Sequence, residues 1–178
     1  LKACHHYYLN YSISLAVYSV LKYYIPVKLS VKWPNDILSD HHKISGILIE
    51  NSIKNDYIKY AIIGIGLNVN QDHFPSDILG ATSLKNILNK TVDKDELLDK
   101  ILFEIRYQLL LIKQKKFKEI KQMYEEVLYR KEMPSMFIDD NDNTFLGKII
   151  GVGDNGKLQI ELENESVQEF ALKEIKFT

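Results

Sequence analysis

Apolar residues recur at helical spacing near the start of the chain and alternate with polar residues soon afterwards. Between Leu9 and Tyr24 they return every three or four positions, which predicts an amphipathic helix with one buried face, ended by Pro26. From Val27 to Lys32 apolar and polar side chains alternate, as in a half-buried strand. The chain is therefore expected to pass from helix to strand around the proline.

Two longer β-rich runs follow a turn at residues 34–36. They cover residues 44–53 and 57–69, and the polar residues 54–56 between them favour a tight turn. We expect these runs to form an antiparallel hairpin in the middle of a sheet. The next segment, residues 71–83, contains proline and glycine and predicts a loop.

Helical periodicity returns in the second half of the chain. Asp93 with Glu96 three residues later is typical of a capping box, and apolar residues at helical spacing continue from there to Ile112. The lysines that follow complement the negative end of a helix dipole. A second, shorter amphipathic helix is predicted over residues 120–128.

After Arg130 the chain changes to short alternating strands, with turn residues at 139–143 and 154–156. So short a run of strands predicts a small barrel that packs on the preceding domain, because it is small to stand alone. We therefore expect one domain over residues 1–131 and a second over residues 132–178.

The composition describes a globular protein without a strong charge. Of the 178 residues 46% are hydrophobic, and 23 basic against 24 acidic residues give a formal net charge of −1. Without a positive field, nucleic acid and anionic membranes are disfavoured as partners. The single Cys4 suits a reducing compartment, and neither a signal-peptide pattern nor an apolar run of about 20 residues is visible, so we expect a cytoplasmic protein.

Two short patterns resemble ligand sites but fail in context. Residues 151–156 match the G-x-G-x-x-G string of dinucleotide-binding proteins, yet a strand-like run follows where a phosphate site needs a helix. Asp139, Asn141 and Asn143 have the spacing of a calcium loop without its glycine and glutamate. We interpret both as turns and assign no metal-ligating residue.

The segment Lys32-Trp33-Pro34-Asn35-Asp36 is the first of three with candidate chemistry. As plain structure it is a turn after a core tryptophan, and in isolation that interpretation is favoured. As a site, the rigid turn would direct an amide, a carboxylate and the Lys32 ammonium into one cleft. Such a group can bind phosphate directly and through Mg²⁺.

Lys43 opens the second segment, residues 43–50, and Gly46 lies inside it. A lysine at the start of an apolar strand can simply extend its ammonium to solvent. Glycine, however, weakens a strand and often marks a bulge or the close approach of a ligand. An ammonium beside a gap in the side-chain wall suits a small carboxylate.

Gly64 and Gly66 are two apart in the third segment, residues 62–70, and therefore face the same side of a strand. Asn68 continues that face. A flat backbone strip that ends in an amide suits a planar heterocycle, because an amide can bond both edges of adenine. Small residues packed under a helix explain the segment equally well.

In this order and at these separations the three segments resemble the motifs of biotin–protein ligases. The family's K-W-P-N-D stands at Lys32–Asp36, its K-[LIV]-[SA]-G-[IV]-L-[IV]-E at Lys43–Glu50, and its I-G-[IA]-G-[IL]-N at Ile63–Asn68. The flanking helices and terminal strands also fit, so the resemblance covers almost the whole chain. It implies an α+β fold: a mixed or antiparallel sheet flanked by helices, as in class II aminoacyl-tRNA synthetases and biotin ligases, with a small C-terminal SH3-like β-barrel.

The resemblance implies a two-step reaction with ATP, biotin and Mg²⁺. Biotin and MgATP give biotinyl-5′-adenylate and pyrophosphate, and a lysine of a biotin carrier domain, from acetyl-CoA carboxylase or a related carboxylase, then takes the biotinyl group and releases AMP. Lys43 matches the family's lysine that contacts the biotin carboxylate and the α-phosphate, and Asp36 is the second expected catalytic residue.

The remaining motif residues are expected to divide between the two substrates. Biotin is expected to contact the lysine and three glycines: Lys43, Gly46, Gly64 and Gly66. ATP is expected to contact four polar residues, the last of them at the adenine: Lys32, Asn35, Asp36 and Asn68.

The chain departs from the family at its start. It lacks the G-R-G-R-x-G loop that biotin–protein ligases carry upstream of the first helix, and it begins at Leu1 rather than at a methionine. We therefore expect it to be the later part of a longer catalytic domain. Two alternatives stay open: a non-catalytic fragment that binds the carrier protein or dimerises, and an enzyme resembling lipoate–protein ligase. A homodimer formed through an exposed sheet edge is a further expectation from the resemblance.

Overall fold

The computed structural model describes residues 1–26, 28–75 and 80–178. After a 3-10 turn at Ala3–His5, its helices are α1 (His6–Tyr24), α2 (Leu84–Leu88), α3 (Lys94–Lys113) and α4 (Phe117–Glu126). The first antiparallel sheet contains β1 (Leu29–Lys32), β2 (Asp36–Ser39), β3 (His42–Lys54) and β4 (Tyr57–Leu67). The second contains β5 (Pro134–Asp139), β6 (Thr144–Val152), β7 (Leu158–Leu162), β8 (Val167–Phe170) and β9 (Ile175–Phe177). The predicted α+β class, with helices flanking antiparallel sheets, is confirmed.

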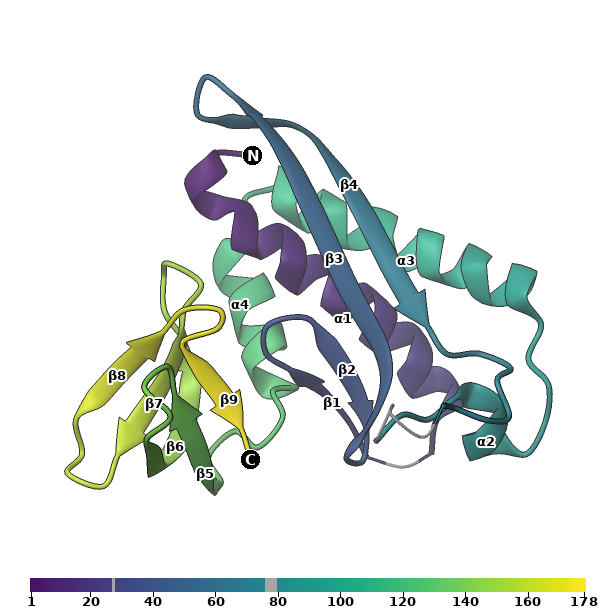
Figure 1. Ribbon diagram of the computed structural model, residues 1–178. Coiled ribbons are helices and arrows are strands. Elements are labelled where there is room, and N and C mark those ends of the chain that lie inside the picture. Colours follow the sequence, from purple (N-terminus) through teal and green to yellow (C-terminus); the bar gives the residue numbers. More distant parts are fainter. Residues whose placement is uncertain (27, 76–79) are drawn as a thin grey trace.

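Three helices, α1, α3 and α4, lie together on one face of the first sheet (Figure 1). The helix α1 is central, because it contacts β1 and β3 as well as α3 and α4. It buries the apolar residues predicted from the sequence: Leu9, Ile13, Ala16, Val17, Val20 and Leu21. The prediction of a single buried face is wrong, because every residue from Tyr11 to Val17 is buried between the sheet and the two neighbouring helices. Full burial of one larger aliphatic side chain contributes roughly 1.5–3 kcal/mol, so these side chains anchor the helix to the sheet. Among the described helices, none is long and apolar enough to span a membrane.

The helix ends follow local signals. Asp93 caps α3 as predicted, because its Oδ1 accepts from the backbone N–H groups of Asp95 and Glu96 at 2.9 and 3.1 Å. The short helix α2 was not expected; it begins after Ser83, whose Oγ accepts from the Asn86 N–H at 3.1 Å. Within the predicted loop at 71–83, residues 76–79 lie outside the described residues, as does Val27 of the predicted first strand.

The strands β3 and β4 form the predicted hairpin, paired from Ser45 and Leu67 to Lys54 and Tyr57. The order of the sheet is β1-β2-β3-β4, so the expectation that the hairpin lies in the middle of a sheet is wrong. In the part of the chain that the structure describes, β4 is the edge strand. The reason is that the later strands pair with one another in a separate sheet instead of extending this one.

A β-bulge interrupts the pairing of β2 with β3. Ile37 pairs with Ser45, but the next residue, Leu38, pairs with Lys43, which leaves Ile44 as the extra residue. In a regular strand, residues three apart point to opposite faces. Because of the extra residue, Lys43 and Gly46 lie on the same face of the sheet.

The second sheet follows α4 and has the order β8-β7-β6-β5-β9. All its pairs are antiparallel, and its size fits the small C-terminal domain that was expected. The predicted boundary at residue 131 falls between the end of α4 and the start of β5. The division at that residue and the closure of this sheet into an SH3-like barrel stay predictions.

The turn between β6 and β7 joins the second sheet to α1, α4 and the turn that contains Trp33. The Trp33 indole N–H donates to the Gly156 carbonyl at 3.2 Å, and the Tyr7 hydroxyl donates to the Asp154 carbonyl. Burial raises the pKa of Tyr7 to about 12, so this phenol remains a donor at neutral pH. Lys121 of α4 forms an ion pair with the Asp154 carboxylate at 2.8 Å. The G-x-G-x-x-G string is therefore a hairpin turn, as interpreted, and one contact between the two parts.

Replacement of Gly156 by alanine tests this contact. Gly156 has φ +82°, and a Cβ there would lie 2.8 Å from the Tyr7 Cβ. We expect the free energy of unfolding to fall by about 3 kcal/mol, from backbone strain and overpacking together. The measurement is urea unfolding followed by the fluorescence of Trp33, the single tryptophan of the chain.

Gly80→Ala is the matched control for this substitution. Gly80 has φ +73°, but no described atom lies within 4 Å of the added methyl group. The control should lose about 1 kcal/mol, from the backbone alone. Equal losses in the two variants would contradict the proposed contact at the turn.

Candidate functional site

A row of four paired residues crosses the first sheet. Gly66 pairs with Gly46, Gly46 with Asp36, and Asp36 with Lys32. Directly paired residues of an antiparallel sheet point to the same face, and neighbouring strands lie ~4.8 Å apart. The register therefore places residues from all three predicted segments side by side on one face.

Lys43 joins this row through the β-bulge. Its Nζ lies 2.6 Å from Asp36 Oδ1, with the ammonium half exposed and the carboxylate less so. A Cβ at Gly46 would lie 3.1 Å from Lys43 Nζ and 3.2 Å from Asp36 Oδ1. The absence of a side chain at Gly46 thus leaves the space that the ion pair occupies.

A cavity of about 410 Å³ opens beside this ion pair. Four of the predicted site residues line it: Lys43, Gly46, Gly66 and Asn68. The Asn68 backbone N–H donates to the Ile44 carbonyl at 2.9 Å, and its side-chain amide donates to the Thr82 carbonyl at 3.0 Å. The cavity therefore has an ammonium at one side, a glycine floor and an amide that is held by the adjoining loop.

Asn35 lies apart from this cavity. Its side-chain amide donates to the Ile47 carbonyl, and the Ile47 N–H donates to the Asn35 carbonyl at 3.0 Å. These two bonds attach the turn after Trp33 to β3. The described contacts give Asn35 a structural part, and its contact with the phosphates stays a prediction.

Gly64 is on the same face as the other two glycines but farther along the hairpin. It pairs with Leu48, whose side chain is 64% exposed. Neither Gly64 nor Leu48 lines the cavity beside Lys43. The predicted biotin contact of Gly64 therefore requires a ligand that extends along β3 and β4 beyond this cavity.

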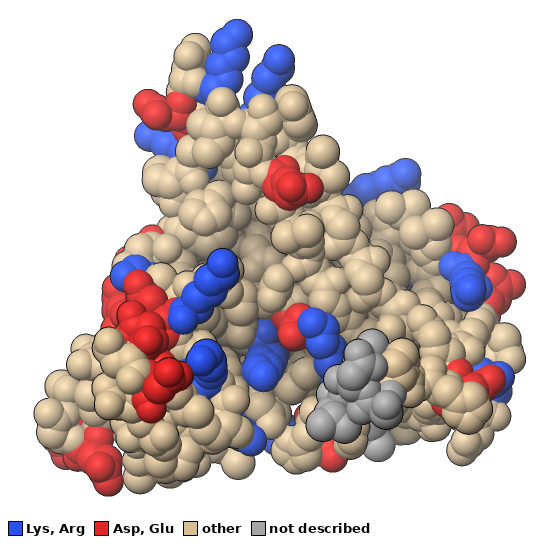
Figure 2. Space-filling model, in the orientation of Figure 1, with Lys and Arg blue, Asp and Glu red and all other residues tan. Residues whose placement is uncertain are grey.

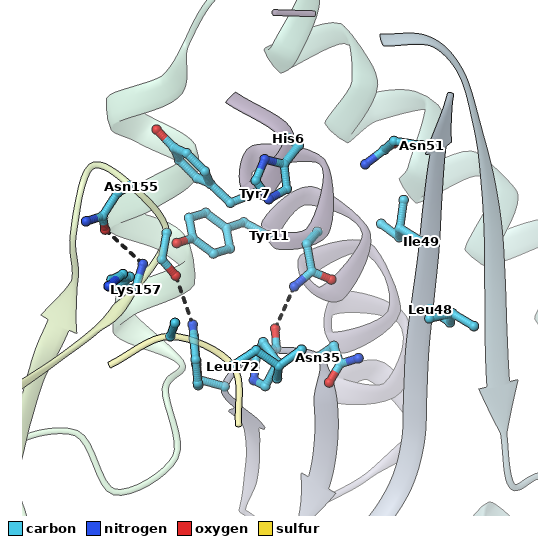
Figure 3. Close-up of a pocket in the computed structure, with 15 residues that line it drawn as sticks. His6, Tyr7, Tyr11, Asn35, Leu48, Ile49, Asn51, Asn155, Lys157 and Leu172 are labelled. Atoms are coloured by element: carbon cyan, nitrogen blue, oxygen red, sulfur yellow. Dashed lines mark hydrogen bonds between the residues drawn. The ribbon is translucent and has the colours of Figure 1, made fainter. Parts of the chain in front are cut away.

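A second cavity, also of about 410 Å³, lies between α1, β3 and the second sheet (Figure 3). Tyr7 and Tyr11 enter from α1, and Asn155 with Lys157 from the turn between β6 and β7. Burial raises the pKa of Tyr11 above the usual range for a phenol, so it is neutral. This cavity lies along the junction of the two parts and lacks the paired charges found at Lys43.

Lys32 lies at the other end of the row, against the second sheet. Its Nζ is 4.8 Å from the centre of the Phe177 ring. Burial lowers the pKa of Lys32, and the nearby cations Arg130 and Lys43 lower it further, whereas Asp36 raises it. Figure 2 shows basic groups gathered around an acidic one in the hollow of this face.

Sequence reasoning missed several residues of this region. Phe74 and Ala81 line the cavity from the segment that was predicted only as a loop. Arg130 and Phe177 approach Lys32 from segments far away in the sequence. The chain has only two arginines, Arg106 and Arg130, and this scarcity was the one signal that could have drawn attention to them.

Comparisons with known proteins show the family of the chain. Residues 2–68 match the biotin/lipoate A/B protein ligase family. The chain is 34% identical over 148 residues to the bifunctional ligase/repressor BirA of Bacillus spizizenii, covering 77% of this chain and 43% of the relative. It is 33% identical over 161 residues to BirA of Bacillus subtilis, covering 84% and 46%. The chain thus spans less than half the length of these curated relatives.

Solved structures give the same result over nearly the full chain. The apo biotin protein ligase of Aquifex aeolicus superposes with a TM-score of 0.79 and 30% identity, over 98% of this chain and 76% of that one. The same enzyme in complex with biotin and ATP also gives a TM-score of 0.79 and 30% identity, over 97% and 72%.

Gly46→Ala tests whether the glycine makes room for the ion pair. The added methyl group should separate Lys43 Nζ from Asp36 Oδ1 beyond ion-pair distance, as observed in a crystal structure of the variant. The free energy of unfolding should fall by less than about 1 kcal/mol, because a pair this exposed contributes little to stability.

Gly64→Ala serves as the control on the same face. Its methyl group would lie 3.7 Å from the Leu48 carbonyl oxygen, an ordinary contact, so the ion pair should persist. An intact pair in Gly46→Ala would show that the glycine has another role.

Proposed function

The chain belongs to the biotin/lipoate A/B protein ligase family, among the biotin protein ligases, and on this premise we propose that it carries the reaction centre of a biotin–protein ligase. The proposed activity joins biotin to ATP as biotinyl-5′-adenylate and transfers the biotinyl group to a lysine of a carrier domain. The observation that carries the proposal is the ion pair of Lys43 with Asp36, beside the cavity lined by Gly46, Gly66 and Asn68.

In the first step a biotin carboxylate oxygen attacks the α-phosphorus of ATP, and the bond to the β-phosphate breaks. Two anions must approach each other, which opposes the reaction in water. The Lys43 ammonium, placed at the edge of the cavity, would neutralise both as they meet and stabilise the charge that develops. Because Asp36 holds this ammonium at 2.6 Å, its position is set before the substrates arrive.

In the second step the amine of the carrier lysine attacks the carbonyl of the mixed anhydride, and AMP leaves. The amine loses one proton in this step. We propose the Asp36 carboxylate as the group that accepts it. Lys43 would then stabilise the departing phosphate. No residue of the chain needs to form a covalent intermediate.

Mg²⁺ fits this site as a companion of the nucleotide. Among the described residues no three histidine, cysteine or acidic side chains converge on a metal position. Mg²⁺ in nucleotide enzymes commonly takes one or two carboxylates together with substrate phosphates, and Asp36 could be such a carboxylate. The ion would add positive charge at the phosphates.

The carrier partner follows from the same proposal. A Paracoccus denitrificans relative, 35% identical over 63 residues, is named biotin–[acetyl-CoA-carboxylase] ligase. We propose a biotin carrier domain of this or a related carboxylase as the acceptor, and the cytoplasm as the location. For a homodimer, the open edge of β4 is the surface we propose.

Lys43→Ala in an active, full-length form tests the proposed centre. We expect biotin-dependent ATP–pyrophosphate exchange to fall by about 10²–10³-fold, because one aligned charge at the reacting atoms is lost. The fold should persist, because the ammonium is half exposed. Lys100→Ala, which removes an ion pair of 2.7 Å from α3, is the control and should leave exchange unchanged. Unfolding of Lys43→Ala would favour a purely structural lysine.

A comparison of chain lengths tests the alternatives. We expect biotin-dependent exchange from a chain extended upstream, with little or none from this chain alone. Exchange by neither would contradict the ligase proposal. Competition between biotin and lipoate in a thermal-shift measurement separates the two ligand classes of the family, and a shift with lipoate only would overturn the assignment to biotin.

A further inference from the structure

The row of site residues continues past β1 into the segment that follows α4. Val31 forms a parallel bridge with Leu128, and the Tyr129 N–H donates to the Val31 carbonyl at 2.8 Å. The next residue along the chain, Arg130, is therefore brought beside Lys32. Its charge acts on that lysine, since the guanidinium lowers the pKa of Lys32 after the larger effect of burial.

The last strand, β9, and the residue that follows it contact the two cations. The Phe177 ring lies 4.8 Å from Lys32 Nζ, and the main-chain oxygen of Thr178 accepts from Arg130 Nη1 at 2.9 Å. Phe177 is itself packed against Phe137 of β5, with ring centres 5.5 Å apart. The last residues of the chain thus hold Lys32 and Arg130 at the end of the row of site residues.

Neither of these two cations pairs with a carboxylate side chain among the described residues. No aspartate or glutamate of that part of the chain lies within ion-pair distance of Lys32 or Arg130. Asp36, the residue paired with Lys32 across β1 and β2, forms its ion pair with Lys43. A partly buried ammonium beside a guanidinium, neither of them in an ion pair with an aspartate or glutamate side chain, attracts an anion.

We propose that Lys32 and Arg130 bind the β- and γ-phosphates of the nucleotide, which leave as pyrophosphate, and that Phe177 holds Lys32 in position. The order along the row supports this direction: the glycines come first, then Lys43 with Asp36, and Lys32 lies one strand, ~4.8 Å, beyond Asp36. Arginine suits the end of a polyphosphate, because its planar fork binds phosphate oxygens in pairs. This inference rests on the proposed function, from which it takes the nucleotide.

Inorganic pyrophosphate is the ligand that tests this proposed binding site. Titration calorimetry with the chain at fixed low ionic strength should show binding that Arg130→Ala and Lys32→Gln each weaken by about ten-fold or more. Phe177→Leu should weaken it by about two- to five-fold, from the loss of the cation–π contact. Arg106→Ala, at the other arginine of the chain and exposed on α3, removes the same charge and should have no effect.

A comparison of ATP binding with AMP binding distinguishes a phosphate-binding site from a general structural role of Arg130. In the longer, active chain, Arg130→Ala should weaken ATP binding but leave AMP binding unchanged, because AMP lacks the two outer phosphates. Circular dichroism checks that each variant is folded, and Arg130→Lys, which keeps the charge, should restore most of the pyrophosphate affinity. If Arg130→Ala does not fold, Lys32→Gln with Phe177→Leu decides the question.

The inference is overturned if the wild-type chain binds no pyrophosphate, or if Arg130→Ala binds it as well as Arg106→Ala does. It is also overturned if Arg130→Ala weakens the binding of ATP and the binding of AMP equally. Failure of the proposed function has a different signature: no biotin-dependent exchange in the longer chain, with pyrophosphate binding and its dependence on Arg130 intact.

Discussion

The arrangement of the site depends on one extra residue in β3. Burial of Val31, Ile37 and Ile47 against the helices fixes which face of each strand points inward, and therefore fixes the register of the sheet. Within that register only the bulge at Ile44 allows Lys43 to share a face with Gly46. Without it the ammonium would point toward the core, away from Asp36. The core packing and the chemistry are thus linked through a single irregularity.

Much of the fold could be predicted because its signals are local. The apolar spacing of α1, the cap at Asp93 and the polar turn between β3 and β4 each depend on a few neighbouring residues. The errors concern relations between distant segments. Whether β4 is central or at an edge depends on which strands pair elsewhere, and no local pattern in residues 57–67 carries that information. The helix α2, of five residues, is too short for its periodicity to be recognised.

The same contrast between local signals and long-range contacts applies to the candidate site. Its motifs could be found in the sequence, and the structure brings Lys43, Gly46, Gly66 and Asn68 to one cavity. The bulge that turns Lys43 toward that cavity has no sequence signal beyond a glycine nearby. Arg130 reaches Lys32 only because the segment after α4 pairs with β1, and such pairing depends on the packing of the whole helical layer. Contacts of this kind follow from the complete fold.

The turn between β6 and β7 limits how far the second sheet can be treated as an exchangeable module. Trp33 belongs to the motif that also contains Lys32 and Asp36, and its indole bonds to the turn at Gly156. A chimaera that took this sheet from a relative would need a turn of the same length, with glycine at the matching place. It would also need an aromatic ring at the position of Phe177. The unit that can be exchanged is therefore defined by its contacts and is larger than the strands alone.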